Sequence, residues 1–193
     1  MKLSIITDLT DLNNVYSDLS EAFEVTYLPN CSKEEFLRKC SDCEVIFTNP
    51  NNAKFPLNGE VLGRLASLKI ITTASTGTVH IDKEFCLHND IKVLAITDER
   101  DTLQKISSTA EHAVLLTLTL LRKTHLSTNS VWAGEWDYSE FIGRQVNQLK
   151  IGTLGLGRLG TMYLQTMKAM GAEVHYYDPY KKNKSFISSS SLK

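Results

Sequence analysis

Short apolar runs and amphipathic segments alternate along the first hundred residues of the chain. Runs that suit buried strands cover residues 3–7, 24–28, 44–48, 68–73 and 92–96. Segments with helical spacing lie between them, at residues 12–23, 32–40, 59–66 and in a short stretch that opens with Asp82. Strands that alternate with helices predict a parallel sheet covered on both faces. We therefore expect a flavodoxin-like α/β domain over residues 1–100.

The same pattern resumes near the end of the chain, after a charged crossover at residues 97–105. The apolar run Leu149–Leu154 predicts a short strand, and Glu173–Tyr177 predicts the next one. Between them, helical spacing is kept by Leu159, Met162, Tyr163, Thr166, Met167 and Met170, and Gly171 ends the helix. This order predicts the first part of a Rossmann-type domain over residues 101–180. Residues 181–193 lose the periodicity and become rich in Lys and Ser, which predicts a disordered tail.

The turn between that strand and helix is rich in glycine. In a dinucleotide-binding turn the first glycine permits a tight bend, the second lets a pyrophosphate approach the backbone, and the third lets the helix pack against the strand. The phosphates would rest on free N–H groups at the helix start, where Arg158 adds a mobile positive charge. The spacing therefore predicts a nucleotide site at Gly155, Leu156, Gly157, Arg158, Leu159 and Gly160.

Asp178 closes the strand that follows this turn and helix. A carboxylate at this place accepts hydrogen bonds from the adenosine ribose hydroxyls and repels a 2'-phosphate. We therefore expect NAD, in preference to NADP, as the cofactor. The alternative is an ordinary glycine-rich turn with a surface aspartate nearby.

The segment from Ser108 to about His125 has almost no polar face. A helix that is apolar all round must be buried in a large core or against a partner. We expect this helix to be such a buried element, in a core or against a partner.

Charge, hydropathy and cysteine content narrow the range of partners. The chain has 22 acidic and 21 basic residues, so its charge does not indicate a nucleic acid or an anionic membrane surface. No apolar run is long enough to span a bilayer, and the first residues lack a signal peptide's apolar core, so we expect a cytoplasmic protein.

The four cysteines are too few for a disulfide scaffold. Cys40 and Cys43 form a C-x-x-C without a second ligand pair, so we interpret it as packing and expect no metal.

Four stretches together resemble the D-isomer-specific 2-hydroxyacid dehydrogenases, the family that includes D-3-phosphoglycerate dehydrogenase. They span residues 74–180 in the family's order. They are the loop Ala74-Ser75-Thr76-Gly77-Thr78-Val79-His80-Ile81-Asp82, the stretch Ser107-Ser108-Thr109-Ala110-Glu111-His112, the tripeptide Gly134-Glu135-Trp136, and the glycine turn continuing to Tyr176-Tyr177-Asp178-Pro179.

The resemblance implies NAD binding that also involves Thr109 and Pro179, and a 2-hydroxy or 2-oxo acid as substrate. It places the substrate carboxylate at loops that contain Asn49, Thr76 and Gly77. Backbone N–H groups around Thr76 and Gly77 suit an anion, with Gly77 supplying a positive φ; ordinary turn residues are the alternative there. It also places the helix after Ser108 at a dimer interface, with Trp132 and Trp136 in an arm that embraces the second subunit. The resemblance therefore implies a homodimer.

The resemblance places the catalytic arginine and the histidine with its glutamate downstream of the Asp-Pro pair that matches Asp178 and Pro179. We therefore expect a C-terminally truncated family member that is inactive alone, and assign no catalytic residue. His112 matches a packing residue of the family and is not assigned as an acid or base. The remaining histidines have no carboxylate residue at a sequence spacing that would predict an acid–base pair. They are His80, His88, His125 and His175.

Two other functions remain open. One is a non-catalytic NAD-binding or dimerisation module, such as a sensor of NAD or a subunit that pairs with a full-length partner. The other is an unrelated nucleotide-binding domain.

Overall fold

The computed structural model describes residues 1–10, 12, 14–51 and 54–191. The predicted helix over residues 12–23, the loop after Asn49 and the tail after residue 180 each include residues outside this described part. The chain forms two compact units, Met1–Leu103 and Gln104–Lys193, so the division lies slightly later than the expected one at residue 100.

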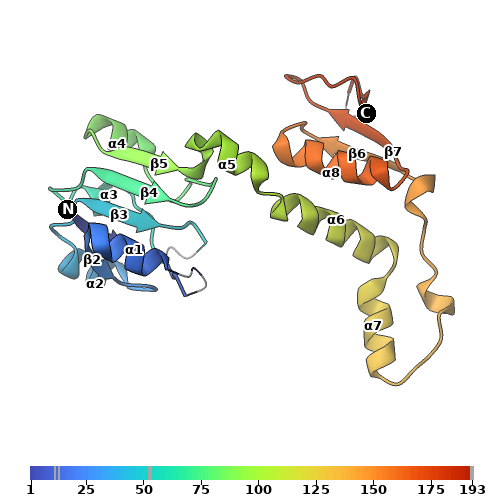
Figure 1. The fold of residues 1–193 in the computed structure, drawn as a ribbon, viewed down its shortest axis with the longest axis horizontal. Helices are drawn as coiled ribbons and strands as arrows, with labels where there is room; N and C mark the ends of the chain where they lie inside the picture. The colour runs from blue at the N-terminus through green and yellow to red at the C-terminus, as the bar shows by residue number, and fades with distance from the viewer. Residues whose placement is uncertain (11, 13, 52–53, 192–193) are drawn as a thin grey trace. The chain divides into compact units, whose positions relative to one another are not determined.

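The first unit is built on a five-stranded parallel sheet in the order β2-β1-β3-β4-β5 (Figure 1). This is the strand order of flavodoxin-like folds, and it confirms the predicted parallel α/β class. The strands are β1 (Lys2–Ile5), β2 (Glu24–Tyr27), β3 (Val45–Thr48), β4 (Ile70–Thr73) and β5 (Lys92–Ala95).

Side-chain caps fix the starts of three of the helices between these strands. Ser32 accepts a hydrogen bond from the N–H of Glu35 at 3.2 Å, and Asp82 accepts one from Phe85 at 2.9 Å. Asn58 caps the third helix in the same way. Each cap typically contributes about 1 kcal/mol. The helices of this unit are α1 (Val15–Ala22), α2 (Lys33–Lys39), α3 (Gly59–Leu62) and α4 (Lys83–His88).

Alternation along the strands gives the sheet two apolar faces. Leu3 and Ile5 of β1 pack with Val45 of β3 and with side chains of α1. Ile46 of β3 points to the opposite face, because successive strand residues alternate. That second face carries the larger core, in which all four cysteines are buried.

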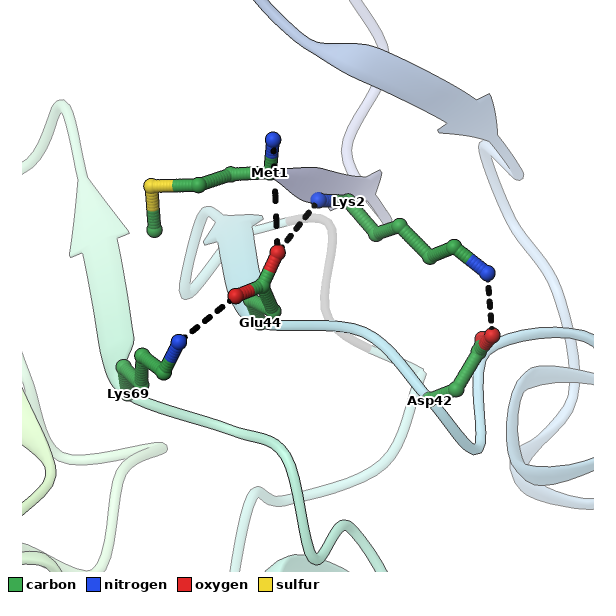
Figure 2. A network of polar contacts seen from close by, with 5 residues as sticks. All are labelled: Met1, Lys2, Asp42, Glu44 and Lys69. Atoms are coloured by element: carbon green, nitrogen blue, oxygen red, sulfur yellow. Dashed lines mark hydrogen bonds and ion pairs between the residues drawn. The ribbon is translucent and has the colours of Figure 1, made fainter.

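A polar network joins the amino ends of three neighbouring strands (Figure 2). The Glu44 carboxylate accepts a hydrogen bond from Lys69 Nζ at 2.7 Å and another from the backbone N–H of Lys2 at 3.0 Å. The Lys69 bond, followed by the Lys2 amide, lowers the pKa of Glu44. Asp42 pairs with the Lys2 ammonium, and the amino group of Met1 lies 4.0 Å from Glu44. These contacts hold the amino ends of the strands together. The loops that are expected to bind ligands follow the opposite, carboxyl ends of the strands.

The second unit contains a three-stranded parallel sheet in the order β6-β7-β8 (Figure 1). Helix α8 packs on β6 and β7, and α6 packs on α8. Leu164 and Met167 of α8 are fully buried with Val174 and Tyr176 of β7. The elements are α6 (Ser108–Leu121), α7 (Thr124–Trp132), β6 (Lys150–Leu154), α8 (Arg158–Ala169), β7 (Glu173–Tyr177) and β8 (Ile187–Ser188), with 3-10 turns at Ser139–Phe141 and Val146–Gln148.

Two connecting segments differ from the sequence prediction. The single helix expected from Ser108 to about His125 is two helices, because Lys123 adopts a left-handed conformation with φ of 51° between α6 and α7. The charged crossover expected at residues 97–105 contains a short 3-10 turn, Ile96–Asp98, and helix α5, Arg100–Lys105.

The expected disorder after residue 180 also differs from the structure. Phe186 is buried in the core of the second unit, and Ile187 pairs with His175 of β7. One aromatic side chain and a short ladder thus order a segment whose composition is dominated by Lys and Ser. Within the described part of the chain, none of the helices combines the length and apolar character needed to cross a membrane.

Candidate functional site: the glycine turn and Asp178

The glycine turn lies between the end of β6 and the first residue of α8. Gly155 has a φ of +93°, a conformation that L side chains rarely adopt. A Cβ on Gly160 would lie 2.6 Å from the carbonyl oxygen of Gly155, so only glycine fits where the helix meets the turn. These are the two conformational roles that the spacing predicts for the first and third glycines.

Gly157 differs from the other two glycines. Its φ of −71° and ψ of −171° are open to any residue, and a Cβ there would have no neighbour within 4 Å. No conformational or packing demand of the described chain therefore requires glycine at this position. The open space lies at the start of a 12-residue helix, where backbone N–H groups favour an anion.

Asp178 points into this turn. One carboxylate oxygen accepts the N–H of Leu156 at 2.6 Å, and the other accepts the N–H groups of Tyr180 and Lys181 at 2.8 and 2.9 Å. The Leu156 bond, followed by the Tyr180 bond, lowers the pKa of Asp178, so the group is an anion at neutral pH. The side chain is held at the carboxyl end of β7, directly beside the carboxyl end of β6.

Arg158 does not remain the mobile charge that the sequence predicts. Its guanidinium donates a hydrogen bond to the carbonyl oxygen of Ile106, just before α6. The positive charge is therefore anchored between the starts of α6 and α8. Thr109 is exposed in the first turn of α6, Pro179 is exposed after Asp178, and Leu159 is half-buried in α8.

In the first unit, the structure brings the two expected substrate loops together. A Cβ on Gly77 would lie 3.9 Å from Pro50, the neighbour of Asn49. Asn49 is half-buried and accepts the N–H of Asn51 at 3.0 Å, and Thr76 is exposed. Ser75 donates to the carbonyl oxygen of Gly77 at 2.8 Å and thereby closes the second loop.

The expected positive φ of Gly77 is wrong. Positive φ occurs at Gly134, Gly155 and Gly171 among the described glycines, and Gly77 is not one of them. The Ser75 hydroxyl shapes this loop, so a left-handed residue is not needed for the chain to turn.

Two buried polar groups near these loops were not singled out by the sequence. Thr48, the last residue of β3, is fully buried, and its hydroxyl has no partner among the described residues. Neither ring nitrogen of His80 has such a partner, although the residue is only 8% exposed. Burial lowers the pKa of His80, which favours the neutral ring. Hydropathy patterns give no signal for such groups, because a single polar residue in an apolar stretch has many explanations.

Two histidines differ from the sequence expectation. His112 is exposed on α6 and does not pack as its family match implied, and the neighbouring Glu111 accepts a hydrogen bond from Ser107. His175, for which no carboxylate partner was expected, lies 2.6 Å from Glu173 because alternate strand residues share a face. This pair lies toward the amino end of β7, whose first residue is Glu173, and the glycine turn adjoins the other end of the strand.

The C-x-x-C pair is buried in the first unit. Burial raises the pKa of the Cys43 thiol to about 11, and it also raises the pKa of Cys40. All four cysteines are free and buried. No cluster of three or more metal-ligating side chains occurs within residues that the structure describes.

Comparison with known proteins identifies the second unit. Residues 114–192 match the sequence model of the D-isomer specific 2-hydroxyacid dehydrogenase NAD binding domain. The D-3-phosphoglycerate dehydrogenase of Methanocaldococcus jannaschii is 31% identical over 84% of this chain. The 4-methyl-2-oxopentanoate reductase A of Aspergillus oryzae is 26% identical over 90% of this chain. The chain spans 29% of the first relative's length and 54% of the second's.

Solved structures share the fold. The D-lactate dehydrogenase of Aquifex aeolicus, complexed with NAD and lactic acid, aligns with a TM-score of 0.79 at 24% identity, over 97% of this chain and 56% of its own. The NAD-dependent formate dehydrogenase of Staphylococcus aureus, in complex with NAD, aligns with a TM-score of 0.80 at 23% identity, over 98% of this chain and 60% of its own. The family predicted from the motifs is confirmed. Residues 114–192 are an NAD-binding domain segment of the D-isomer specific 2-hydroxyacid dehydrogenase type, and the chain is related to that family over most of its length.

Proposed function

We propose that the second unit binds NAD at the glycine turn. The pyrophosphate would rest on the N–H groups at the start of α8, in the open space beside Gly157. The adenosine ribose would donate a hydrogen bond to Asp178. The single observation that carries this proposal is the Asp178 carboxylate, held 2.6 Å from the N–H of Leu156 and thus at the turn itself. We propose that Thr109, Arg158 and Pro179 border the same site.

The proposed activity of the whole protein is NAD-dependent oxidation of a D-2-hydroxy acid, or the reverse reduction of the 2-oxo acid. The loops at Asn49 and at Thr76 and Gly77 follow the carboxyl ends of β3 and β4, where ligands of open parallel sheets bind. We propose that they hold the substrate carboxylate. The orphaned Thr48 hydroxyl beside Asn49 supports a polar ligand at this edge.

Hydride transfer also needs a cation that grips the carboxylate and carbonyl oxygens, and a group that exchanges the hydroxyl proton. Arg158, the cation within the glycine turn, is committed to the Ile106 carbonyl, and the His175–Glu173 pair lies toward the opposite end of the strand. We assign neither role to a residue of this chain. The 193-residue chain is therefore proposed to bind NAD without turnover.

A dimerisation role is the second candidate function, and one observation favours it. Helix α6 is apolar, yet Leu116 and Leu120 are 50% and 71% exposed. A cavity of about 540 Å³ lies between α6 and α8, lined mainly by apolar atoms of both helices. Trp136 beyond α7 is 93% exposed. We propose that a second copy of the chain covers this surface as a homodimer.

We propose the cytoplasm as the compartment. Its support is that all four cysteines are free thiols, which suits a reducing environment.

A calorimetric titration of NAD into wild-type protein and Asp178→Ala tests the binding proposal. We expect saturable binding to the wild type and a loss of about tenfold or more in the variant, because the ribose loses its acceptor and the turn loses a hydrogen bond. Equal affinity in the two proteins would favour an unrelated nucleotide site. Formation of NADH from a panel of D-2-hydroxy acids would refute the absence of turnover.

A further inference from the structure

The carboxylate of Asp178 is already occupied by protein donors. Three backbone N–H groups, from Leu156, Tyr180 and Lys181, bond to its two oxygens. A carboxylate has about four acceptor positions, so roughly one remains for a ribose hydroxyl unless an amide is displaced. Asp178 therefore discriminates less strongly between a ribose 2'-hydroxyl and a 2'-phosphate than an aspartate without protein donors would.

The segment after Asp178 is positively charged. Residues 179–191 contain Lys181, Lys182 and Lys184 and no acidic residue. Lys181 is the first of these, its N–H lies 2.9 Å from the Asp178 carboxylate, and its positive charge contributes to the lowered pKa of that group. The segment then runs back along β7 toward the amino end of the sheet, where Lys168 of α8 donates to the carbonyl oxygen of Ser185. Lys181 is thus the lysine of this segment whose own backbone N–H bonds to the Asp178 carboxylate.

We propose that Lys181 is a specificity-determining residue, whose ammonium group offsets the Asp178 charge at the ribose 2' position and lets the site accept NADP as well as NAD. This inference rests on the proposed NAD site. Electrostatically, the 2'-phosphate of NADP meets one fixed anion and one flexible cation, so the repulsion is largely compensated. We expect NADP to bind within about tenfold of NAD, since one exposed charge is worth up to about 1 kcal/mol, or about fivefold in affinity.

The test is the ratio of the NADP and NAD dissociation constants, measured by calorimetry on four proteins. They are the wild type, Lys181→Ala, Lys181→Arg and the control Lys184→Ala, which removes the same charge from the same exposed segment. We expect Lys181→Ala to raise the ratio by about fivefold, Lys181→Arg to keep it, and Lys184→Ala to change it by less than about twofold. High salt should shrink the difference between the wild type and Lys181→Ala. Circular dichroism verifies that all four proteins are folded.

An unchanged ratio in Lys181→Ala, an equal rise in Lys184→Ala, or a wild-type preference for NAD above about a hundredfold would overturn the role of Lys181. In each of these outcomes NAD still binds, so the proposed site stands. If a folded wild-type chain binds neither nucleotide, the proposed function fails, and the Lys181 inference fails with it.

Discussion

The carboxylate of Asp178 accepts a hydrogen bond from the backbone N–H of Leu156 at 2.6 Å. The two residues are 22 positions apart in sequence and lie just beyond the carboxyl ends of the neighbouring parallel strands β6 and β7. The bond means that the acidic group and the glycine turn form one structural unit before any ligand arrives. A nucleotide site that is organised in this way loses little conformational entropy when the nucleotide binds.

The first prediction concerns the pH dependence of this link. Backbone donors lower the folded-state pKa of Asp178 below its unfolded value. The stabilisation by the carboxylate is therefore present above about pH 4 and is lost as the pH falls through the folded-state pKa. We expect Asp178→Asn to be less stable than the wild type at pH 7 and the difference to shrink at pH 3. Urea unfolding at both pH values measures it, and a difference that grows on acidification contradicts the assignment.

The second prediction separates two glycines of the turn. Gly160→Ala places a methyl group 2.6 Å from the Gly155 carbonyl oxygen, so the free energy of unfolding should fall by about 1–3 kcal/mol. Gly157→Ala meets no atom within 4 Å and is the matched control, with expected stability close to wild type. Equal stability of the two variants would show that the helix does not approach the turn as closely as described.

The third prediction concerns the thiols. Burial raises the pKa of Cys43 to about 11, and all four cysteines are buried. A thiol reagent at pH 8 should therefore react slowly with the native protein and rapidly once it is unfolded. Because the folded-state pKa is raised, stability should also decrease as the pH rises from about 8.5 toward 11. Rapid labelling of the native protein would contradict the buried packing of these residues.

The fourth prediction concerns self-association. Leu120→Lys places a charge on the exposed apolar face of α6 and should convert the proposed dimer into a monomer of 21.7 kDa. Leu87→Lys on α4 is the control, because Leu87 is also an exposed leucine but lies in the first unit. Light scattering at matched concentrations measures the mass. A wild-type protein that is monomeric at every concentration, or an equal effect of both variants, contradicts a dimer through α6.

Much of the fold follows from local patterns. Alternating strands and helices predict the parallel sheet, and the helices expected after Ser32 and Asp82 are capped by those two side chains. The ends of β7 match the expected Glu173–Tyr177. These features are local, because they depend on residues within one turn or one strand of each other.

The features that differ from the sequence prediction each depend on a single residue and its tertiary contacts. Lys123 breaks the apolar helix although no glycine or proline marks the break. Phe186 orders a Lys- and Ser-rich segment because it finds a core that the segment's own composition does not reveal. The Ile106 carbonyl holds Arg158, a contact across 52 positions that no local pattern predicts. The partners of a long polar side chain are decided by packing between elements.

We propose that the space beside Gly157 receives the pyrophosphate of NAD, and a decisive experiment is the calorimetric titration of NAD into wild-type and Gly157→Ala protein. We expect saturable binding to the wild type and at least about a tenfold weaker affinity in the variant, with unchanged thermal stability, because the added methyl group would occupy the space of the pyrophosphate. Equal affinities in the two folded proteins would contradict it.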